Sequence, residues 1–159
     1  MFERFTREAR AIVTSAAEEA ELRADSRIGT EHLLIAAAGA QSLGGTLPTM
    51  EELRERLDRL DEEALLSVGL DPALIGDGGG SRPGHLRKHV PFTGAAKDTL
   101  KGALKEAIAL GHRHIGAEHI ALALTAGTGP DRALSALEGL GYSSDEIRAS
   151  ILRRVQRAS

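Results

Sequence analysis

The sequence contains no cysteine and no tryptophan, and only three phenylalanines and one tyrosine among its 159 residues. The absence of cysteine excludes disulfide bonds and zinc sites built from thiolates. Because aromatic residues are scarce, the core has to be built from alanine, leucine, isoleucine and valine. A core rich in alanine and leucine favours closely packed helices over sheets.

The sequence also lacks a large excess of charge of either sign: its net charge is −3. Proteins that bind nucleic acids use a basic stripe to displace counterions, so we expect no nucleic-acid partner. No apolar run reaches the ~18 residues of a membrane span, and the start Met1–Phe5 lacks the apolar segment of a signal peptide. We therefore expect a cytoplasmic protein with no membrane partner.

An internal repeat is visible in the sequence. Three pairs of matching segments are all separated by 87 residues: Phe5-Thr6 and Phe92-Thr93, Glu19-Ala20 and Glu106-Ala107, Ile28–His32 and Ile115–His119. Chance matches would have scattered spacings, whereas a duplication produces one constant spacing. The sequence therefore predicts two copies of one structural unit.

The first two helices of each copy follow from apolar periodicity and capping residues. Thr6 and Thr93 are typical N-caps, and they predict first helices over 7–24 and 94–110, the second ending before Gly111. Thr30 is expected to cap a second helix that ends at Gly39. The corresponding helix of the second copy is expected from Glu118 to about Thr125.

Further helices complete each copy. In the second copy we expect a third helix from about Asp131 to Leu140 and a fourth that opens at Ser143. In the first copy Thr49–Glu52 resembles a capping box and predicts a long charged helix. A short final turn is expected after Asp71-Pro72, with Leu74 and Ile75.

These elements predict three regions. Residues 1–75 form the first repeat with an insertion at about 41–66, residues 76–91 form a glycine-rich linker, and residues 92–159 form the second repeat. The linker is flexible by composition. It is not a phosphate-binding loop, because no Lys-Ser or Lys-Thr pair follows its glycines.

Four segments together carry a family resemblance: Met1–Thr6, Ile28–Leu34, His89–Thr93 and Gly111–Ile120. They resemble the Clp N-terminal (Clp repeat) domain, in particular the N-domain of ClpC-type unfoldases. The resemblance covers nearly the whole chain. It implies an all-α fold in which two four-helix repeats, related by a pseudo-twofold axis, pack as one double-repeat domain.

The resemblance also implies a function. In the family this domain receives substrates and adaptor proteins for an ATPase ring, so the expected partners are a ClpC-type unfoldase, its substrates or its adaptors. Here we expect a stand-alone actinobacterial-type protein that ends at Ser159. It would act as an adaptor, as a decoy or as a protein that sequesters drugs (a drug sponge). A segment cut from a longer ATPase is the other interpretation. We expect no enzyme activity and no cofactor, since neither a nucleophile motif nor a paired acid constellation occurs.

Two types of binding site are implied by the resemblance. The first is a phosphoarginine-type pocket at each second-helix start, with Thr30 and Glu31 in the first repeat and Glu118 in the second. A helix start offers free amides to an anion, and a carboxylate beside it offers a partner to a cation. Ala117 stands where the first repeat has Thr30, so a lost cap is expected to weaken the second pocket.

The second implied site binds cyclic peptides, including antibiotics, at the junction of the repeats. Its expected residues are Phe2, Arg10, Val13, Phe92 and Lys97. Thr14 and Lys101 depart from the family pattern, since those positions are usually apolar and acidic. The alternative function is therefore sequestration of such small-molecule ligands.

The histidines His112, His114 and His119 raise the question of a metal site. The first repeat keeps His32 but has no histidine corresponding to His112 or His114. No His-Glu-x-x-His pattern occurs. We therefore expect no metal site.

Overall fold

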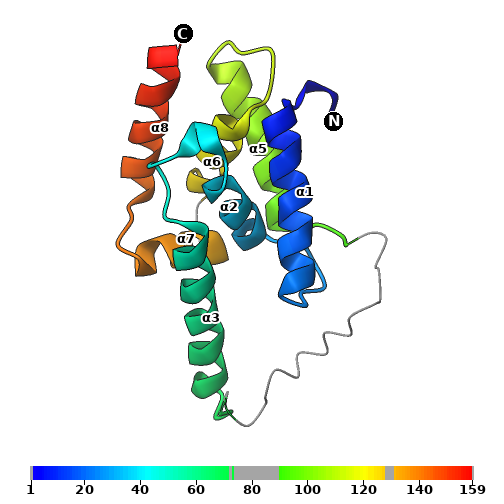
Figure 1. Cartoon of the computed structure of the whole chain (residues 1–159), viewed down its shortest axis with the longest axis vertical. Coiled ribbons are helices and arrows are strands. Elements are labelled where there is room, and N and C mark those ends of the chain that lie inside the picture. Colours follow the sequence, from blue (N-terminus) through cyan, green and yellow to red (C-terminus); the bar gives the residue numbers. More distant parts are fainter. Residues whose placement is uncertain (1, 72, 74–89, 128–130, 159) are drawn as a thin grey trace.

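The computed structural model describes residues 2–71, 73, 90–127 and 131–158. In this part of the chain there are seven α-helices and two short 3-10 helices, but no β-strand (Figure 1). The all-α fold expected from the sequence is therefore confirmed. Most of the predicted linker lies outside the described residues, and so do Leu74 and Ile75 of the predicted final turn of the first repeat.

The first helix of each repeat begins at the predicted residue. Helices α1 (Arg7–Leu22) and α5 (Gly94–Ala109) are capped by the side chains of Thr6 and Thr93, which accept backbone N–H groups three residues later. Each helix buries three alanines at equivalent positions: Ala9, Ala16 and Ala20 in α1, and Ala96, Ala103 and Ala107 in α5. Because alanine projects only a methyl group, the neighbouring helix can approach closely.

The second helices, α2 (Thr30–Ala38) and α6 (Ala117–Thr125), form the centre of the molecule (Figure 1). Nearly every residue of both helices is buried, including the polar residues Thr30, His32, His119 and Thr125. A helix that is apolar on all sides has to be enclosed by others. Helix α1 packs on α2 and α5 packs on α6, and α2 and α6 also contact each other.

The repeats are joined by two matching backbone crossings. In one, the Thr6 N–H donates to Ile115 O at 2.9 Å and the Ile115 N–H donates to Arg4 O at 2.9 Å. In the other, Thr93 donates to Ile28 O at 2.9 Å and Ile28 donates to Pro91 O at 2.8 Å. Since every partner is shifted by 87 residues, the start of each repeat pairs with the segment that precedes the second helix of the other repeat.

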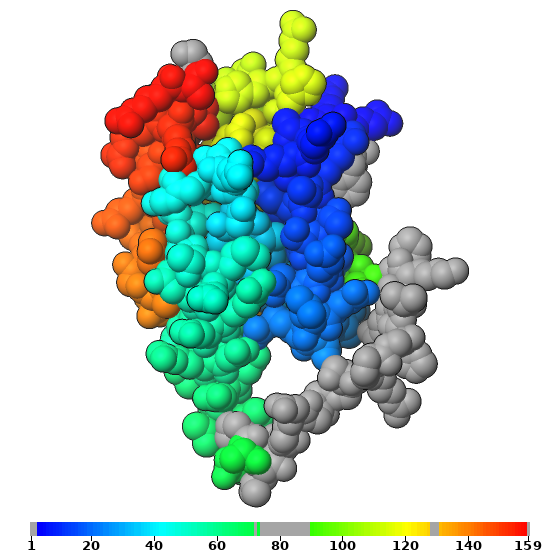
Figure 2. Space-filling view, in the orientation of Figure 1, coloured from blue at the N-terminus to red at the C-terminus, as the bar shows by residue number. Residues whose placement is uncertain are grey.

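The repeats differ after their second helices. In the first repeat, residues 39–49 contain the 3-10 helix η2 (Gln41–Leu43) and lead to the long helix α3 (Met50–Ser67). In the second repeat, only residues 126–131 precede α7 (Arg132–Gly139), and α8 (Ser144–Ala158) follows. Helix α3 extends beyond the other helices in Figure 1, and Figure 2 shows the surface of α8 beside the segment around residue 42. A further 3-10 helix, η1 (Phe2–Arg4), precedes α1.

Candidate functional site

The starts of the two central helices have the same local geometry. The N-cap residues are Gly29 and Gly116, and each donates its backbone N–H to Nδ1 of the histidine three residues later, at 2.8 Å in both repeats. The prediction that Thr30 caps α2 was therefore wrong, because Thr30 is already the first helical residue. The capping hydrogen bond is made by the histidine ring, so the replacement of this threonine by Ala117 removes no cap.

A glutamate folds back over each cap glycine. A Cβ atom added to Gly29 would lie 2.6 Å from Oε2 of Glu31, and one added to Gly116 would lie 2.6 Å from Oε2 of Glu118. Such an approach is shorter than any ordinary carbon–oxygen contact. A side chain at either position would therefore displace the carboxylate from its place over the helix start.

The first of these helix starts is covered by the second repeat. The Thr30 hydroxyl donates to the Asp131 carboxylate at 3.0 Å, and Asp131 in turn caps α7. The guanidinium of Arg132, the first residue of α7, lies 3.8 Å from the Glu31 carboxylate and 2.8 Å from that of Asp61. Only 13% of the Glu31 side chain is exposed as a result.

Arg132 belongs to a cluster of charges between α3, α7 and the end of α1. Arg23 lies 2.9 Å from Asp58 and 3.3 Å from Asp61, so both arginines share the Asp61 carboxylate. Burial by itself lowers the pKa of Arg132, but the hydrogen bond that Arg132 donates to Asp61 and the nearby acidic charges outweigh it and raise that pKa above its ordinary value. Arg132 therefore stays positively charged beside Glu31.

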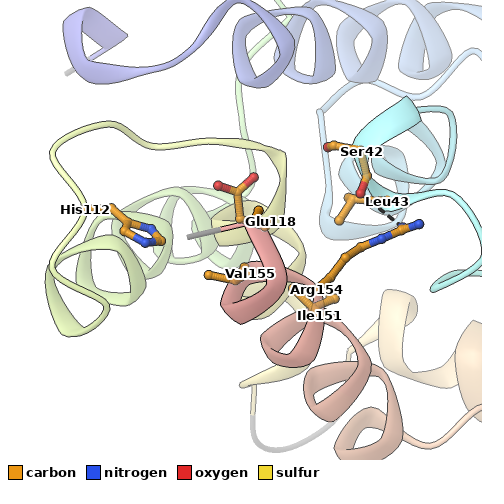
Figure 3. Close-up of a pocket in the computed structure, with 8 residues that line it drawn as sticks. Ser42, Leu43, His112, Glu118, Ile151, Arg154 and Val155 are labelled. Atoms are coloured by element: carbon orange, nitrogen blue, oxygen red, sulfur yellow. Dashed lines mark hydrogen bonds between the residues drawn. The ribbon is translucent and has the colours of Figure 1, made fainter.

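The second helix start opens into a pocket of about 340 Å³ (Figure 3). Glu118 lies at the pocket, and 30% of its side chain is exposed. In the described part of the chain no lysine or arginine forms an ion pair with it, and its nearest titratable neighbour is Nδ1 of His119, at 3.5 Å. The pocket is lined by Ser42 and Leu43 of η2, by His112 and Glu118, and by Ile151, Arg154, Val155 and Ala158 of α8.

Arg154 brings a positive charge to the same pocket. Its Nη1 donates to the carbonyl oxygens of Ser42 at 3.1 Å and Gly44 at 2.6 Å, so the guanidinium bridges α8 and the first repeat. Leu43, Ile151 and Val155 supply apolar surface between the two charged groups. The pocket can therefore receive a ligand that carries both charges and an aliphatic part.

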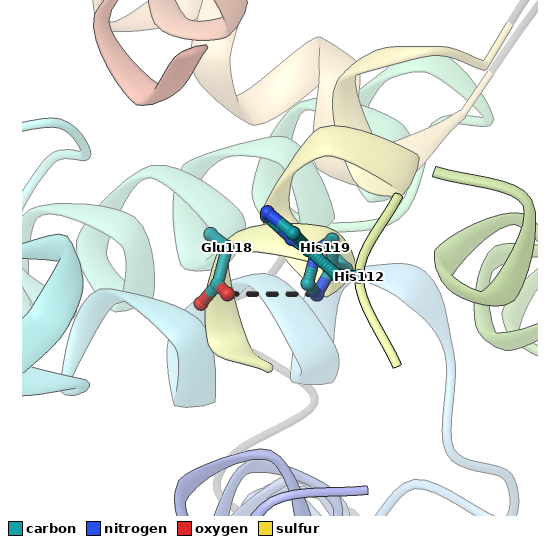
Figure 4. Close-up of side chains that lie close together, drawn as sticks. All are labelled: His112, Glu118 and His119. Carbon is teal, nitrogen blue, oxygen red and sulfur yellow. Dashed lines mark hydrogen bonds and ion pairs between the residues drawn. The ribbon is translucent and has the colours of Figure 1, made fainter. Parts of the chain in front are cut away.

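The histidines beside Glu118 form a close cluster with it: ligand atoms of His112, Glu118 and His119 all lie within 4.8 Å of one another (Figure 4). Because Nδ1 of His119 accepts the Gly116 N–H, its hydrogen has to be on Nε2. That Nε2–H donates to Nδ1 of His112 at 2.8 Å, so neither nitrogen of His119 has a lone pair free for a metal.

The same argument applies to the second cluster, which consists of Asp25, Glu31 and His32. His32 accepts the Gly29 N–H at Nδ1 and donates from Nε2 to Asp25 at 2.7 Å. Asp25 lies 87 residues before His112, so the first repeat has an aspartate at the position of that histidine. Burial raises the pKa of Asp25, but the hydrogen bond from His32 and the positive charges of Arg23 and Arg132 outweigh it and leave that pKa below its ordinary value.

In the second repeat the buried cap histidine has no such carboxylate at Nε2. Burial lowers the pKa of His119 below 6.5; the negative charges of Glu118 and Glu106 oppose this shift, and His112 adds to it. His119 is therefore neutral in the folded protein at neutral pH.

The residues expected at the repeat junction do not line either described pocket. Arg10 and Lys97 are exposed, whereas Val13 and Phe92 are partly buried; the side chain of Phe2 lies outside the described part. A second pocket of about 200 Å³ is formed by residues of η1, of α5 and of the backbone crossing between Phe5 and Ile115: Glu3, Arg4, Phe5, Leu100, Lys101, Leu104 and Ile115. Binding at the junction residues stays a prediction.

Sequence reasoning missed the residues that make the two helix starts different, namely Asp131, Arg132 and Arg154. The predicted helix start at Asp131 was correct. Nothing in the local sequence shows that this start packs against Thr30, about one hundred residues away. Within the described residues, no helix is both long and apolar enough to cross a membrane.

Comparison with known proteins shows which proteins this chain is similar to. No protein-family model matches the chain. The chain is 34% identical over 155 residues to the chloroplastic chaperone protein ClpC1 of Oryza sativa subsp. japonica, covering 98% of this chain and 16% of that protein. It is also 34% identical over 155 residues to ClpC1 of Arabidopsis thaliana, of which it covers 15%. The chain thus spans only about one sixth of the length of these curated relatives.

Solved structures show the same fold. The N-terminal domain of ClpD from Arabidopsis thaliana superposes with a TM-score of 0.75 at 21% identity, covering 98% of this chain and 99% of that one. The Hsp104 N-terminal domain from Candida albicans superposes with a TM-score of 0.61 at 20% identity, covering 94% and 90%. The chain is therefore homologous to the N-terminal region of the ClpC- and ClpA-type chaperones and has the fold of the Clp N-terminal domain.

Proposed function

We propose that the chain is a non-catalytic recognition module of the Clp proteolytic system, which binds substrate or adaptor proteins, including phosphoarginine-marked ones. The observation that carries this proposal is the pocket at the start of α6. It is lined by the Glu118 carboxylate, the Arg154 guanidinium and apolar side chains of η2 and α8. A phosphoarginine side chain has a cationic guanidinium part, an anionic phosphoryl group and an aliphatic stem. Each part has a chemical counterpart in this pocket.

Glu118 would bind the guanidinium part of such a ligand. Arg154 and the free amides of the first turn of α6 would attract the phosphoryl group. Glu31 has a partner already, so Glu118 is the carboxylate that we rank first, which reverses the order expected from the sequence. We further propose a cytoplasmic location, although the plant relatives are chloroplastic.

Calorimetric titration with free phosphoarginine tests this proposal. Glu118→Gln should weaken binding by between about tenfold and about a hundredfold, because a charge-assisted hydrogen bond contributes about 1.5–3 kcal/mol. Glu31→Gln is the matched control, since it changes the equivalent residue of the first repeat, and it should leave binding nearly unchanged. Equal losses from both variants, or no binding by the unmodified chain, would contradict the proposal.

Sequestration of a cyclic peptide is the alternative proposal. It is supported by the pocket at the start of the first repeat, where Phe5, Leu100 and Leu104 provide apolar surface and Lys101 provides charge. A cyclic peptide that binds there should lose affinity in Lys101→Ala but not in Glu118→Gln. A pull-down of a ClpC-type unfoldase with the intact chain would distinguish an adaptor or decoy from a ligand sponge.

A further inference from the structure

The two repeat-related helix starts are internally alike but face different segments of the chain. In both, the histidine Nδ1 lies 3.5 Å from the carboxylate oxygen of the neighbouring glutamate, and the cap hydrogen bond has the same length. The difference in exposure, 13% for Glu31 against 30% for Glu118, therefore comes from what lies in front of them.

The segments in front are the loops that follow the opposite central helix. Helix α2 faces the end of the second loop, where Asp131 and Arg132 supply a carboxylate and a guanidinium. Helix α6 faces the first loop, which presents Ser42 and Leu43 and leaves a pocket. The two loops also differ in length: the first, residues 39–49, has eleven residues, and the second, residues 126–131, has six.

We infer that Arg132 is an internal occupant of the first repeat's site: its guanidinium lies where the guanidinium of a bound ligand would lie, beside Glu31. Asp131 holds the arginine in place, because it accepts the Thr30 hydroxyl and caps α7 at the same time. The chain therefore presents one open site, at Glu118, and one closed site, at Glu31. The nature of the external ligand rests on the proposed function, whereas the closure itself does not.

The internal occupant can be displaced. The side chain of Arg132 is 46% exposed, and ion pairs of such exposure each change an equilibrium by up to roughly fivefold. Arg132 makes two such pairs, with Glu31 and with Asp61. Removing it should therefore strengthen binding at the first site by up to about fivefold if only the Glu31 pair has to break, and by up to about twenty-five-fold if both pairs do.

The experiment measures the first site alone. In a Glu118→Gln background, phosphoarginine is titrated calorimetrically against the chain with and without Arg132→Ala. Arg23→Ala in the same background is the matched control, because Arg23 also pairs with Asp61 but, in the described part of the chain, forms no ion pair with Glu31. A third variant adds Glu31→Gln to Arg132→Ala. Circular dichroism establishes that each variant is folded.

The inference requires a gain in affinity with Arg132→Ala, no gain with Arg23→Ala, and loss of the gain when Glu31→Gln is added. It is overturned if Arg132→Ala gives no gain, or if Arg23→Ala gives the same gain. If the unmodified chain does not bind phosphoarginine but Arg132→Ala does, and Glu31→Gln abolishes that binding, the proposed function fails while the inference holds. If no folded variant binds, both fail.

Discussion

Replacing His119 by alanine tests whether the buried histidines are structural caps. The side chain is 1% exposed, and its Nδ1 is the acceptor for the buried Gly116 N–H. Leaving a buried donor without a partner costs about 1–3 kcal/mol. Removing the ring also leaves a cavity, and we take about 1–2 kcal/mol for that part by comparison with other large-to-small core changes. His119→Ala should therefore lower the free energy of unfolding by about 2–5 kcal/mol.

Urea denaturation followed by far-ultraviolet circular dichroism at pH 7.5 measures this loss. His114→Ala is the matched control, since His114 lies in the adjacent loop and is exposed, and its effect should stay within about 0.5 kcal/mol of zero. His112→Ala should fall between the two, because His112 is partly buried and only accepts from His119. If His119→Ala were as stable as the control, the histidine would not be the cap of α6.

Two further outcomes are expected from the same site. Burial lowers the pKa of His119 in the folded state below 6.5, so below that pH the unfolded chain takes up a proton that the folded chain does not. The free energy of unfolding should therefore be greatest above about pH 6.5 and fall as the pH decreases below it. Urea midpoints at pH 7.5 and 5.5 will measure this fall, which should be smaller in His119→Gln. Gly116→Ala should weaken phosphoarginine binding several-fold, because its Cβ would displace a carboxylate oxygen 2.6 Å away, whereas Gly94→Ala, with nothing within 4 Å of its Cβ, should leave calorimetric binding unchanged.

Local signals in the sequence predicted the helices well. Thr6, Thr93 and Thr49 cap helices where expected, and Gly39 is the C-cap of α2. Positive φ at Gly111 likewise marks the end of α5. These signals are reliable because a cap and its helix lie within a few residues of each other, so no distant packing is needed to form them.

The cap of the central helices was misassigned for a physical reason. Thr30 has the side chain of a good N-cap, and the glycine before it has no side chain to cap with. A histidine at the third helical position can accept the N-cap N–H instead, and this requires a buried ring held by a further partner, Asp25 in one repeat and His112 in the other. The partner lies seven residues before the histidine, in a turn whose path the local pattern does not define.

The sequence by itself determined the duplication, the helical class and the repetition of one motif at the two central helix starts, since a constant spacing of 87 residues needs no knowledge of the packing. Only the tertiary structure decided that the two starts differ. That difference arises because Asp131 and Arg132 pack on the first start, whereas a longer loop and α8 leave a pocket at the second. Contacts between residues so far apart depend on how the repeats dock, and the docking is fixed by the shared core rather than by any local pattern.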